Sequence, residues 1–243
     1  HLPGHSHSDT LSVLLWIGRQ PVVTDTGTYG YVSETDREYA RGVRGHNTVQ
    51  VGELEPISLG CKYLMGPRPV PTTRVVDGPI TTCEGRYEAH PYRGPSYDHH
   101  RVVYAGNRWW LLRDRIAGCE GKPARSRLHL HPAVDPSIEK DGRVVLSLPE
   151  QDVFVYPLES NHVGLSSGKY FPRFGVEKCR PVIEFHAEEN RTEPLSLGCL
   201  ISTRDVEHAS FEADEGDGTT RLRVGEEEYT LPDTALEPSG DFA

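Results

Sequence analysis

Short apolar runs of strand length, separated by turn residues, recur along this chain. Residues 11–17 and 21–23 form two such runs around Gly18-Arg19-Gln20, which predicts a β-hairpin. Similar runs follow at residues 73–77, 101–104, 108–114, 127–131, 143–148, 153–156, 182–186, 196–202 and 220–224. Residues 105–107 predict a further hairpin turn within this series. The regular spacing predicts an all-β fold, an antiparallel double-sheet β-sandwich.

The composition supports this fold and a single large domain. Among 243 residues, 24 glycines and 19 prolines favour short strands joined by turns, and we find no long amphipathic helix. We expect one domain over residues 1–232 and a loose C-terminal tail over residues 233–243. No run of some 18 apolar residues occurs, so the sequence predicts no membrane span.

Two polar stretches interrupt the strand pattern. Residues 30–45 are rich in glycine and arginine and predict a loop that leads to His46 and a strand at residues 48–51. The acidic stretches at residues 212–218 and 226–228 fit a solvated hairpin turn better than a calcium loop, because the EF-hand spacing is absent.

Charge and cysteine usage exclude several classes of function. The formal net charge of −10 argues against a nucleic-acid surface, which needs clustered positive charge. The five cysteines are widely spaced without a C-x-x-C pair, so neither a zinc ribbon nor a dense disulfide framework is indicated, although one or two bridges are compatible with the sequence.

The N-terminal part of the chain concentrates residues able to bind a metal. His7, Asp25 and His46 offer two imidazoles and one carboxylate, a set that suits zinc or a similar divalent ion. The hairpin at residues 11–23 would bring His7 and Asp25 to the same end. His5 lies two residues before His7, on the same face of an extended segment, where it could meet a substrate.

Other histidines fit structural roles better. His129 and His131 alternate with Leu128 and Leu130, as strand alternation alone would produce, and we expect a structural or surface role for both. The alternative is that Arg127, His129, His131 and His186 line one polar sheet face that meets sugar.

The same motifs resemble a known family. Gly4-His5-Ser6-His7-Ser8-Asp9, Asp25-Thr26-Gly27-Thr28-Tyr29 and His46-Asn47-Thr48-Val49 together look like the signature of the heparinase II/III-like polysaccharide lyases, in their C-terminal β-sandwich. Weaker similarities lie at residues 100–103, 109–115 and 172–176, so that the resemblance spans most of residues 1–205.

The resemblance implies a reaction and a missing partner domain. These lyases cleave acidic, uronic-acid-containing polysaccharides by β-elimination, and an N-terminal α/α toroid supplies a tyrosine or histidine base and an asparagine. The chain contains no toroid, so we expect it to be a C-terminal piece of a larger protein and to be inactive alone. Lyases of this kind are periplasmic or secreted, so the resemblance implies the same location for this protein.

The resemblance also implies roles for individual residues. His7, Asp25 and His46 would hold a structural divalent ion, most plausibly zinc, and His5 would be the histidine that the sandwich contributes to the cleft. Tyr31 and Tyr39 are the candidates for a catalytic tyrosine ahead of the ligand histidine, and Tyr29 fits a structural role.

Three other interpretations stay open at this point. A uronate C5-epimerase could use the same scaffold, and a noncatalytic, metal-stabilised sandwich could bind carbohydrate or pack against its own toroid. A cupin also carries His-x-His on a β-scaffold, but its acidic residue follows within a few residues, whereas Asp25 lies much farther along.

Overall fold

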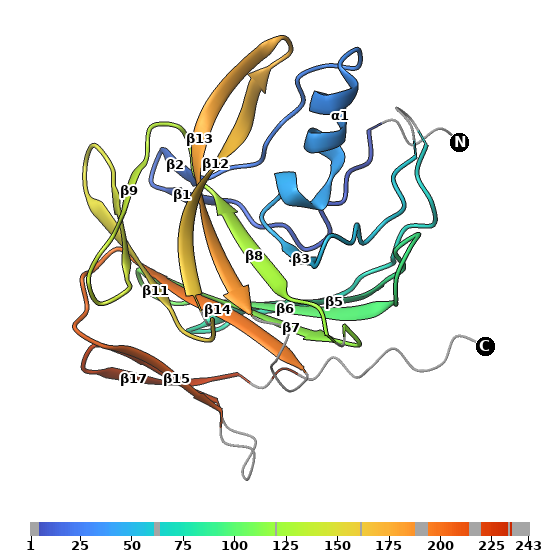
Figure 1. Cartoon of the computed structure of the whole chain (residues 1–243). Coiled ribbons are helices and arrows are strands. Elements are labelled where there is room, and N and C mark those ends of the chain that lie inside the picture. Colours follow the sequence, from blue (N-terminus) through green and yellow to red (C-terminus); the bar gives the residue numbers. More distant parts are fainter. Residues whose placement is uncertain are drawn as a thin grey trace.

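Almost all the regular structure of this protein is β-strand. The computed structural model describes residues 5–60, 64–119, 121–160, 162–187, 194–213, 220–232 and 234. Two main antiparallel sheets face each other, with a smaller sheet below them (Figure 1). The expected β-sandwich is therefore confirmed, with a third layer that the sequence analysis did not anticipate.

The larger sheet has eight strands in the order β4-β5-β6-β7-β14-β11-β10-β9. Consecutive strands β4 to β7 pair as an antiparallel meander, and β14 inserts between β7 and β11. The strands in sequence order are β4 (Thr72–Val76), β5 (Thr81–Ala89), β6 (Tyr97–Ala105), β7 (Trp109–Ala117), β9 (Asp135–Ile138), β10 (Val144–Ser147), β11 (Asp152–Pro157) and β14 (Leu195–Ser202).

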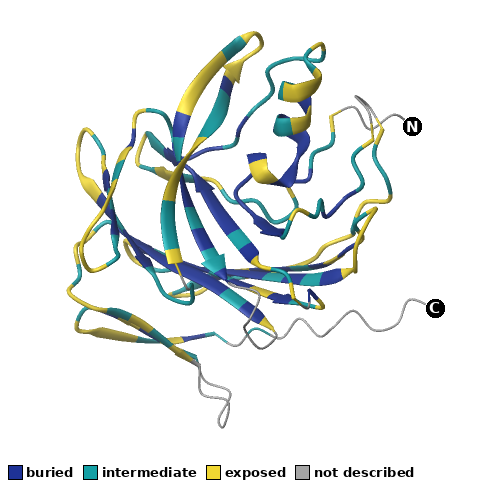
Figure 2. Ribbon diagram, viewed as in Figure 1, coloured by how far each residue is buried: buried dark blue, intermediate teal, exposed yellow. Residues whose placement is uncertain are grey.

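The facing sheet has four strands in the order β12-β13-β8-β3. They are β3 (Val49–Val51), β8 (Ala124–His129), β12 (His162–Arg173) and β13 (Val176–Ala187). β12 and β13 form a long hairpin whose tip projects past the sandwich and is largely exposed (Figures 1 and 2). A shorter hairpin of β1 (Leu15–Ile17) and β2 (Gln20–Val23) stands apart as its own two-stranded sheet.

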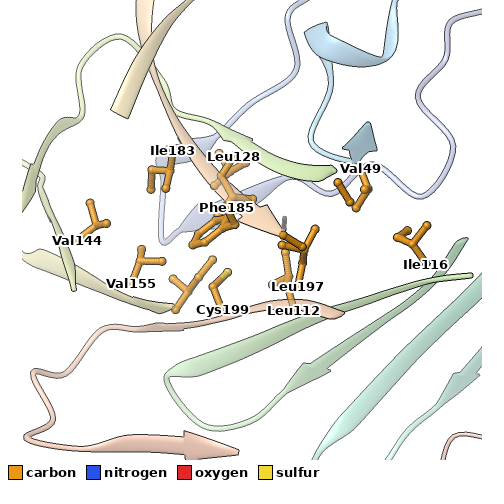
Figure 3. Packing of buried hydrophobic residues seen from close by; sticks show 14 of the residues in the cluster. Val49, Leu112, Ile116, Leu128, Val144, Val155, Ile183, Phe185, Leu197 and Cys199 are labelled. Atoms are coloured by element: carbon orange, nitrogen blue, oxygen red, sulfur yellow. The ribbon is translucent and has the colours of Figure 1, made fainter. Parts of the chain in front are cut away.

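The main core lies between the two large sheets. Leu112 and Leu197 of the eight-stranded sheet meet Leu128, Ile183 and Phe185 of the four-stranded sheet (Figure 3). Each of these side chains is at most 7% exposed, and burial of one such side chain contributes about 1.5–3 kcal/mol. Because successive side chains of a strand point to opposite faces, the residues next to these core residues lie on the outer faces of the two sheets.

A second core lies on the other face of the eight-stranded sheet. Trp109, Leu111 and Leu200 point away from the main core and pack against Leu222 and Leu231. The latter belong to a three-stranded sheet of β15 (Ala209–Ala213), β16 (Thr220–Val224) and β17 (Glu227–Leu231). Of the two acidic stretches, residues 226–228 lie at the hairpin turn between β16 and β17, whereas residues 214–218 of the other stretch lie outside the described part.

The structure corrects the expected loop at residues 30–45. It contains helix α1 (Glu34–Arg41) and the 3-10 turn η1 (Val43–Gly45). The Ser33 side chain accepts a hydrogen bond from the backbone N–H of Asp36 at 3.3 Å and caps the helix N-terminus. Glu34 and Asp36 in the first turn and Arg41 in the last turn complement the helix dipole.

Some expectations fall partly or wholly outside the described residues. Of the expected tail at residues 233–243, the structure describes only Thr234, and Cys61 is likewise not described. Of the other four cysteines, Cys83, Cys179 and Cys199 are free thiols, and Cys119 is buried. Among the described helices, none is long and apolar enough to cross a membrane.

Candidate functional site

The three predicted metal ligands come together beside the open end of the β1–β2 hairpin. Asp25 follows β2, and His46 follows η1 directly. The segment that carries His7 is tied to the C-terminal end of α1, since the backbone N–H of Ser8 donates to the carbonyl of Arg41 at 2.7 Å. The segments that carry His7, Asp25 and His46 flank the β1–β2 hairpin and helix α1, and they therefore meet at one site.

Asp25 and His46 are in direct contact. His46 Nδ1 lies 2.6 Å from Asp25 Oδ2, and the backbone N–H of Gly27 donates to Asp25 Oδ1 at 2.8 Å. The His46 side chain is fully buried. The centroid of the His7 ring lies 5.3 Å from that of His46. The sequence-based grouping of these three residues thus agrees with their positions in space.

The surroundings fix the charge states of this group. Burial, followed by the neighbouring His46, lowers the pKa of His7 from 6.5 to about 4. Burial alone would raise the pKa of Asp25, but the hydrogen bond and charge of His46 and the Gly27 N–H lower it to about 2. At neutral pH the cluster therefore presents a neutral His7 imidazole and a carboxylate, the forms that bind metals.

The residues fit a divalent metal in donor type. His46 Nε2 is enclosed and has no hydrogen-bond partner among the described residues, which leaves a lone pair or a proton unsatisfied next to His7. As the side chains stand, no group of three His, Cys, Asp or Glu residues in the described ranges is arranged to hold a metal. The Asp25 carboxylate is hydrogen-bonded to His46 Nδ1 in this arrangement. A carboxylate in that position commonly orients a histidine that binds a metal through its other nitrogen.

A second cluster forms around His5 and Tyr31. His5 Nδ1 lies 3.1 Å from the Tyr31 hydroxyl, and the two rings meet edge to face with centroids 5.8 Å apart. The Arg37 guanidinium lies 4.9 Å from the centroid of the Tyr31 ring. Phe174, at the tip of the β12–β13 hairpin, contacts the same ring from another side at 5.7 Å. An imidazole and a phenol in hydrogen-bond contact are suited to proton transfer.

Tyr39 has different neighbours. Its hydroxyl accepts a hydrogen bond from the backbone N–H of Lys169 at 3.1 Å, and its ring lies against Phe171 and under Arg44. Tyr29 also packs on Phe171, at 5.5 Å between ring centroids, which agrees with the structural role expected for it. Of the two candidate tyrosines, Tyr31 is the one that the described part of the chain places within hydrogen-bond distance of His5.

Arg180 positions the Asp25 segment and was not anticipated from the sequence. This side chain on β13 is 1% exposed and donates from NH1 to the carbonyls of Thr24 and Asp25, both at 3.0 Å, and from NH2 to Thr26 Oγ1. These contacts hold the backbone so that the Asp25 side chain points to His46. The sequence gives little signal for this role, because Arg180 is one of several charged residues in β13.

Asn47 and Arg101 tie the His46 segment to the sheets. Asn47 Nδ2 donates to the carbonyl of Val13 at 2.8 Å, while its Oδ1 accepts from the His129 backbone N–H at 2.7 Å. Arg101 NH1 donates to the Asn47 carbonyl at 2.5 Å, and its Nε donates to Asp114 Oδ1 at 2.7 Å. His129 is buried and serves this framework, as the sequence analysis expected.

Two open cavities lie beside helix α1. One, of about 470 Å³, lies beside α1 and is lined in part by Arg37, Arg41 and Glu55. The other, also about 470 Å³, lies on the outer face of the four-stranded sheet and includes Tyr39 and Arg127. Both cavities carry guanidinium groups, which pair well with carboxylate or sulfate.

Comparison with known proteins places this arrangement in context. The model of the family described as heparinase II/III-like, C-terminal, matches residues 1–212. No curated protein sequence matches the chain. The structure is similar to that of heparan sulfate lyase HepC from Pedobacter heparinus, with a TM-score of 0.73 and 16% identity over 93% of this chain.

A crystal structure of heparinase III is similar as well, with a TM-score of 0.70 and 15% identity over 93% of this chain. The chain spans only 37% and 36% of these two proteins, so each is much longer than the part compared. At this identity the structures establish a shared fold. The family match covers most of the 243 residues and includes all three motifs, and the chain therefore belongs to the heparinase II/III-like family of polysaccharide lyases, as a C-terminal β-sandwich domain.

Proposed function

We propose that this chain is the sandwich domain of a lyase that cleaves uronic-acid-containing glycans by β-elimination. The observation that carries the proposal is the His5–Tyr31 pair, at 3.1 Å, beside the cluster of His7, Asp25 and His46. His5 and Tyr31 would transfer protons at one wall of the substrate cleft, and the neighbouring cluster would hold them in place. The other wall would come from an N-terminal α/α toroid of the parent protein.

In β-elimination a base removes the C5 proton of a uronate and the glycosidic oxygen leaves from C4. The C5 proton becomes acidic enough only when the adjacent carboxylate is neutralised and the developing charge is stabilised. His5 would donate a hydrogen bond to that carboxylate. Tyr31, in contact with His5 and with Arg37 over its ring, would give or take a proton at its hydroxyl.

We propose a divalent ion, zinc by donor type, at His7, His46 and Asp25. It would supply a cross-link between the segment before β1, the turn after β2 and the segment after η1. Its role in this proposal is structural. Asp25 would act either as a ligand or by orienting His46 through Nδ1.

A noncatalytic, metal-stabilised sandwich is the second candidate. It is favoured by the depth of the cluster, since His46 is fully buried and His7 is held neutral by its surroundings. A C5-epimerase would share the uronate intermediate but return the proton from the opposite face. A periplasmic or secreted location is part of the proposal, because the polysaccharide substrate of such a lyase lies outside the cytoplasm.

Elemental analysis of the purified chain tests the metal site first. We expect about one zinc or similar ion per chain, lost in His7→Ala and His46→Ala together with a fall in melting temperature. A chain that stays metal-free after refolding with zinc would contradict the proposed site.

Activity must be tested in the parent protein. His5→Ala and Tyr31→Phe there should lower the yield of unsaturated product from an acidic glycan by about a hundredfold or more, with metal content unchanged. Exchange of the C5 proton without cleavage would instead support an epimerase. Full activity in both variants would support the noncatalytic interpretation.

A further inference from the structure

The outer face of the four-stranded sheet carries a group of positive side chains away from the His5 cluster. On β13, Ile183 and Phe185 face the main core, so strand alternation places Glu184 and His186 on the outer face. On β8, Leu128 faces the core, and Arg125 and Arg127 face outward in the same way. This face is therefore polar and rich in basic groups.

His186, Arg125 and His162 of β12 form one row across adjacent strands. His162 of β12 lies opposite His186 of β13, and His186 lies opposite Arg125 of β8. Gln50 of β3 completes the row opposite Arg125. Residues directly opposite in antiparallel strands have Cβ atoms about 4.5–5.5 Å apart, and the two imidazole centroids here are 5.7 Å apart.

The described residues neutralise this row only in part. Arg125 forms no ion pair or hydrogen bond with them, and its Nε is enclosed without a partner. The nearest carboxylate, Glu184, is bound by Arg127 Nε at 2.9 Å, while its other oxygen lies 3.7 Å from His186 Nε2. Like charges directly opposite each other destabilise a sheet, so a row of this kind gains from a bound anion.

The electrostatics of His186 agree with this geometry. Burial lowers its pKa below 6.5, and Arg125, His162 and Arg127 lower it further, whereas only Glu184 raises it. An oxyanion bound between these groups would reverse the unfavourable contributions and favour the protonated ring.

We propose that Arg125, His162 and His186 form a binding site for an oxyanion of an acidic glycan, either a sulfate ester or a uronate carboxylate. Arg125 would bind the oxyanion through its guanidinium, the two imidazoles would donate hydrogen bonds, and the Gln50 amide borders the site. His162 is exposed and His186 and Arg125 are half-buried, so a ligand can reach the row.

The row is separate from the proposed catalytic groups. Arg180, which holds the Asp25 segment, and His186 lie six residues apart on the same face of β13. At about 3.3 Å per residue this separation is roughly 20 Å. A glycan engaged at His5 could extend along this face to the row, yet anion binding at the row does not depend on the lyase proposal.

Titration of the full chain with inorganic sulfate tests the site. We expect sulfate to shift the imidazole NMR signals of His162 and His186 and to raise the pKa of His186 by about one unit. Binding should be tighter at about pH 6 than at about pH 8, because the His186 ring, which faces Arg125, Arg127, His162 and Glu184, binds an anion most strongly when it is protonated.

Variants separate the site from general charge effects. Arg125→Gln and His162→Gln should each weaken sulfate binding about tenfold, whereas Arg115→Gln, at an exposed arginine of β7, should leave it unchanged. His162→Gln alters an exposed side chain, so it keeps the test valid if Arg125→Gln fails to fold. Equal binding by wild type and His162→Gln, or the absence of sulfate-induced shifts, would overturn the proposal.

Two oligosaccharides of equal length identify the anion. A sulfated heparin fragment and an unsulfated polyuronate fragment are compared in wild type and Arg125→Gln. Arg125-dependent binding of the first alone assigns a sulfate site, and Arg125-dependent binding of both assigns a carboxylate site. Binding of neither, or binding indifferent to Arg125, counts against the proposal. The metal-site test with His7→Ala is independent of these results, so failure of one proposal can be told from failure of the other.

Discussion

Gly27 shows how closely the candidate site depends on single residues. Its φ is +77°, and a Cβ added there would lie 2.4 Å from the carbonyl oxygen of Phe171 on β12. The same stretch is bound to β12, since the Phe171 N–H donates to the Thr26 carbonyl at 2.8 Å. Glycine in this motif therefore allows the Asp25 turn to lie against the long hairpin.

We expect Gly27→Ala to lower the free energy of unfolding by about 3 kcal/mol or more, because backbone strain adds to the clash with Phe171. Gly18→Ala is the matched control. Gly18 also has a positive φ, +59°, but nothing lies within 4 Å of its added Cβ, so only about 1 kcal/mol of strain is expected. Equal urea midpoints for the two variants would show that the contact with Phe171 carries no energy.

Arg180 allows a test of positioning at the same scale. Arg180→Lys keeps a positive charge but loses the planar group that reaches Thr24, Asp25 and Thr26 together. We expect zinc affinity to fall about tenfold or more, as for other partners that orient ligands. The Nδ1 proton signal of His46 should also shift, a change that a merely structural role would not produce.

Arg223→Lys, at an exposed arginine paired with Glu228, is the control and should alter neither measurement. An Arg180→Lys variant with unchanged zinc affinity and an unchanged His46 signal would show that the Asp25 turn holds its conformation without this guanidinium.

At the residue scale, the sequence predicted which site residues lie close together when a short hairpin connects them. His7 and Asp25 flank one hairpin, so their proximity follows from strand pairing. Arg180 lies 155 residues from Asp25, and no local pattern connects them. The Asp25–His46 hydrogen bond was equally out of reach, because it depends on the turn of α1 and η1.

At the scale of elements, β6 and β7 meet at a buried ion pair. Arg101 and Asp114 lie opposite each other, both at most 3% exposed, with His99 Nε2 2.7 Å from the same carboxylate. Arg101→Met should cost about 3–5 kcal/mol of unfolding free energy, since it leaves a buried carboxylate with one lost partner.

The control for this prediction is Arg113→Met in the neighbouring strand β7. Arg113 pairs with Glu159 where the two side chains are 16% and 19% exposed, so neither charge is fully buried and we expect a smaller loss of about 1 kcal/mol. Denaturant titration of both variants measures the difference. A similar loss in both would mean that water or a rearranged side chain compensates Asp114.

Elements were predicted well where apolar alternation is strong and poorly elsewhere. All nine strand runs after residue 72 correspond to strands, but β5, β9 and β12 of the two main sheets were missed. In β12, two glycines and two serines give the segment the composition of a loop. α1 was missed because its buried residues include Arg37 and Arg41, so it lacks an apolar stripe. The Ser33-x-x-Asp36 pattern was the available signal for its start.

At the scale of the whole molecule, buried histidines make stability depend on pH. Burial is the largest cause that lowers the pKa of His99 and of His129, and the latter lies well below 6.5. The unfolded chain thus binds more protons than the folded chain below about pH 6.5, so stability is present above that pH and is lost as pH falls.

We expect the free energy of unfolding to decrease by about 1–3 kcal/mol per pH unit between about pH 6 and pH 4.5. Urea titrations with chelator present, which removes any contribution from a bound metal, measure this slope. His129→Gln should reduce the slope by about one proton. A stability that stays flat or rises toward pH 4.5 would contradict the assignment of neutral buried rings.

The link between Arg180 and the Asp25 turn has a consequence for how the protein is made. Its hydrogen bonds to Thr24 and Asp25 close loops of 156 and 155 residues, so the turn cannot be fixed until β13 has been synthesised and paired. Such non-local closure slows folding, and the eight-stranded sheet meanwhile exposes unpaired edges. The cluster of His7, Asp25 and His46 lies early in the sequence, yet it is among the last parts of the nascent chain to reach its final form.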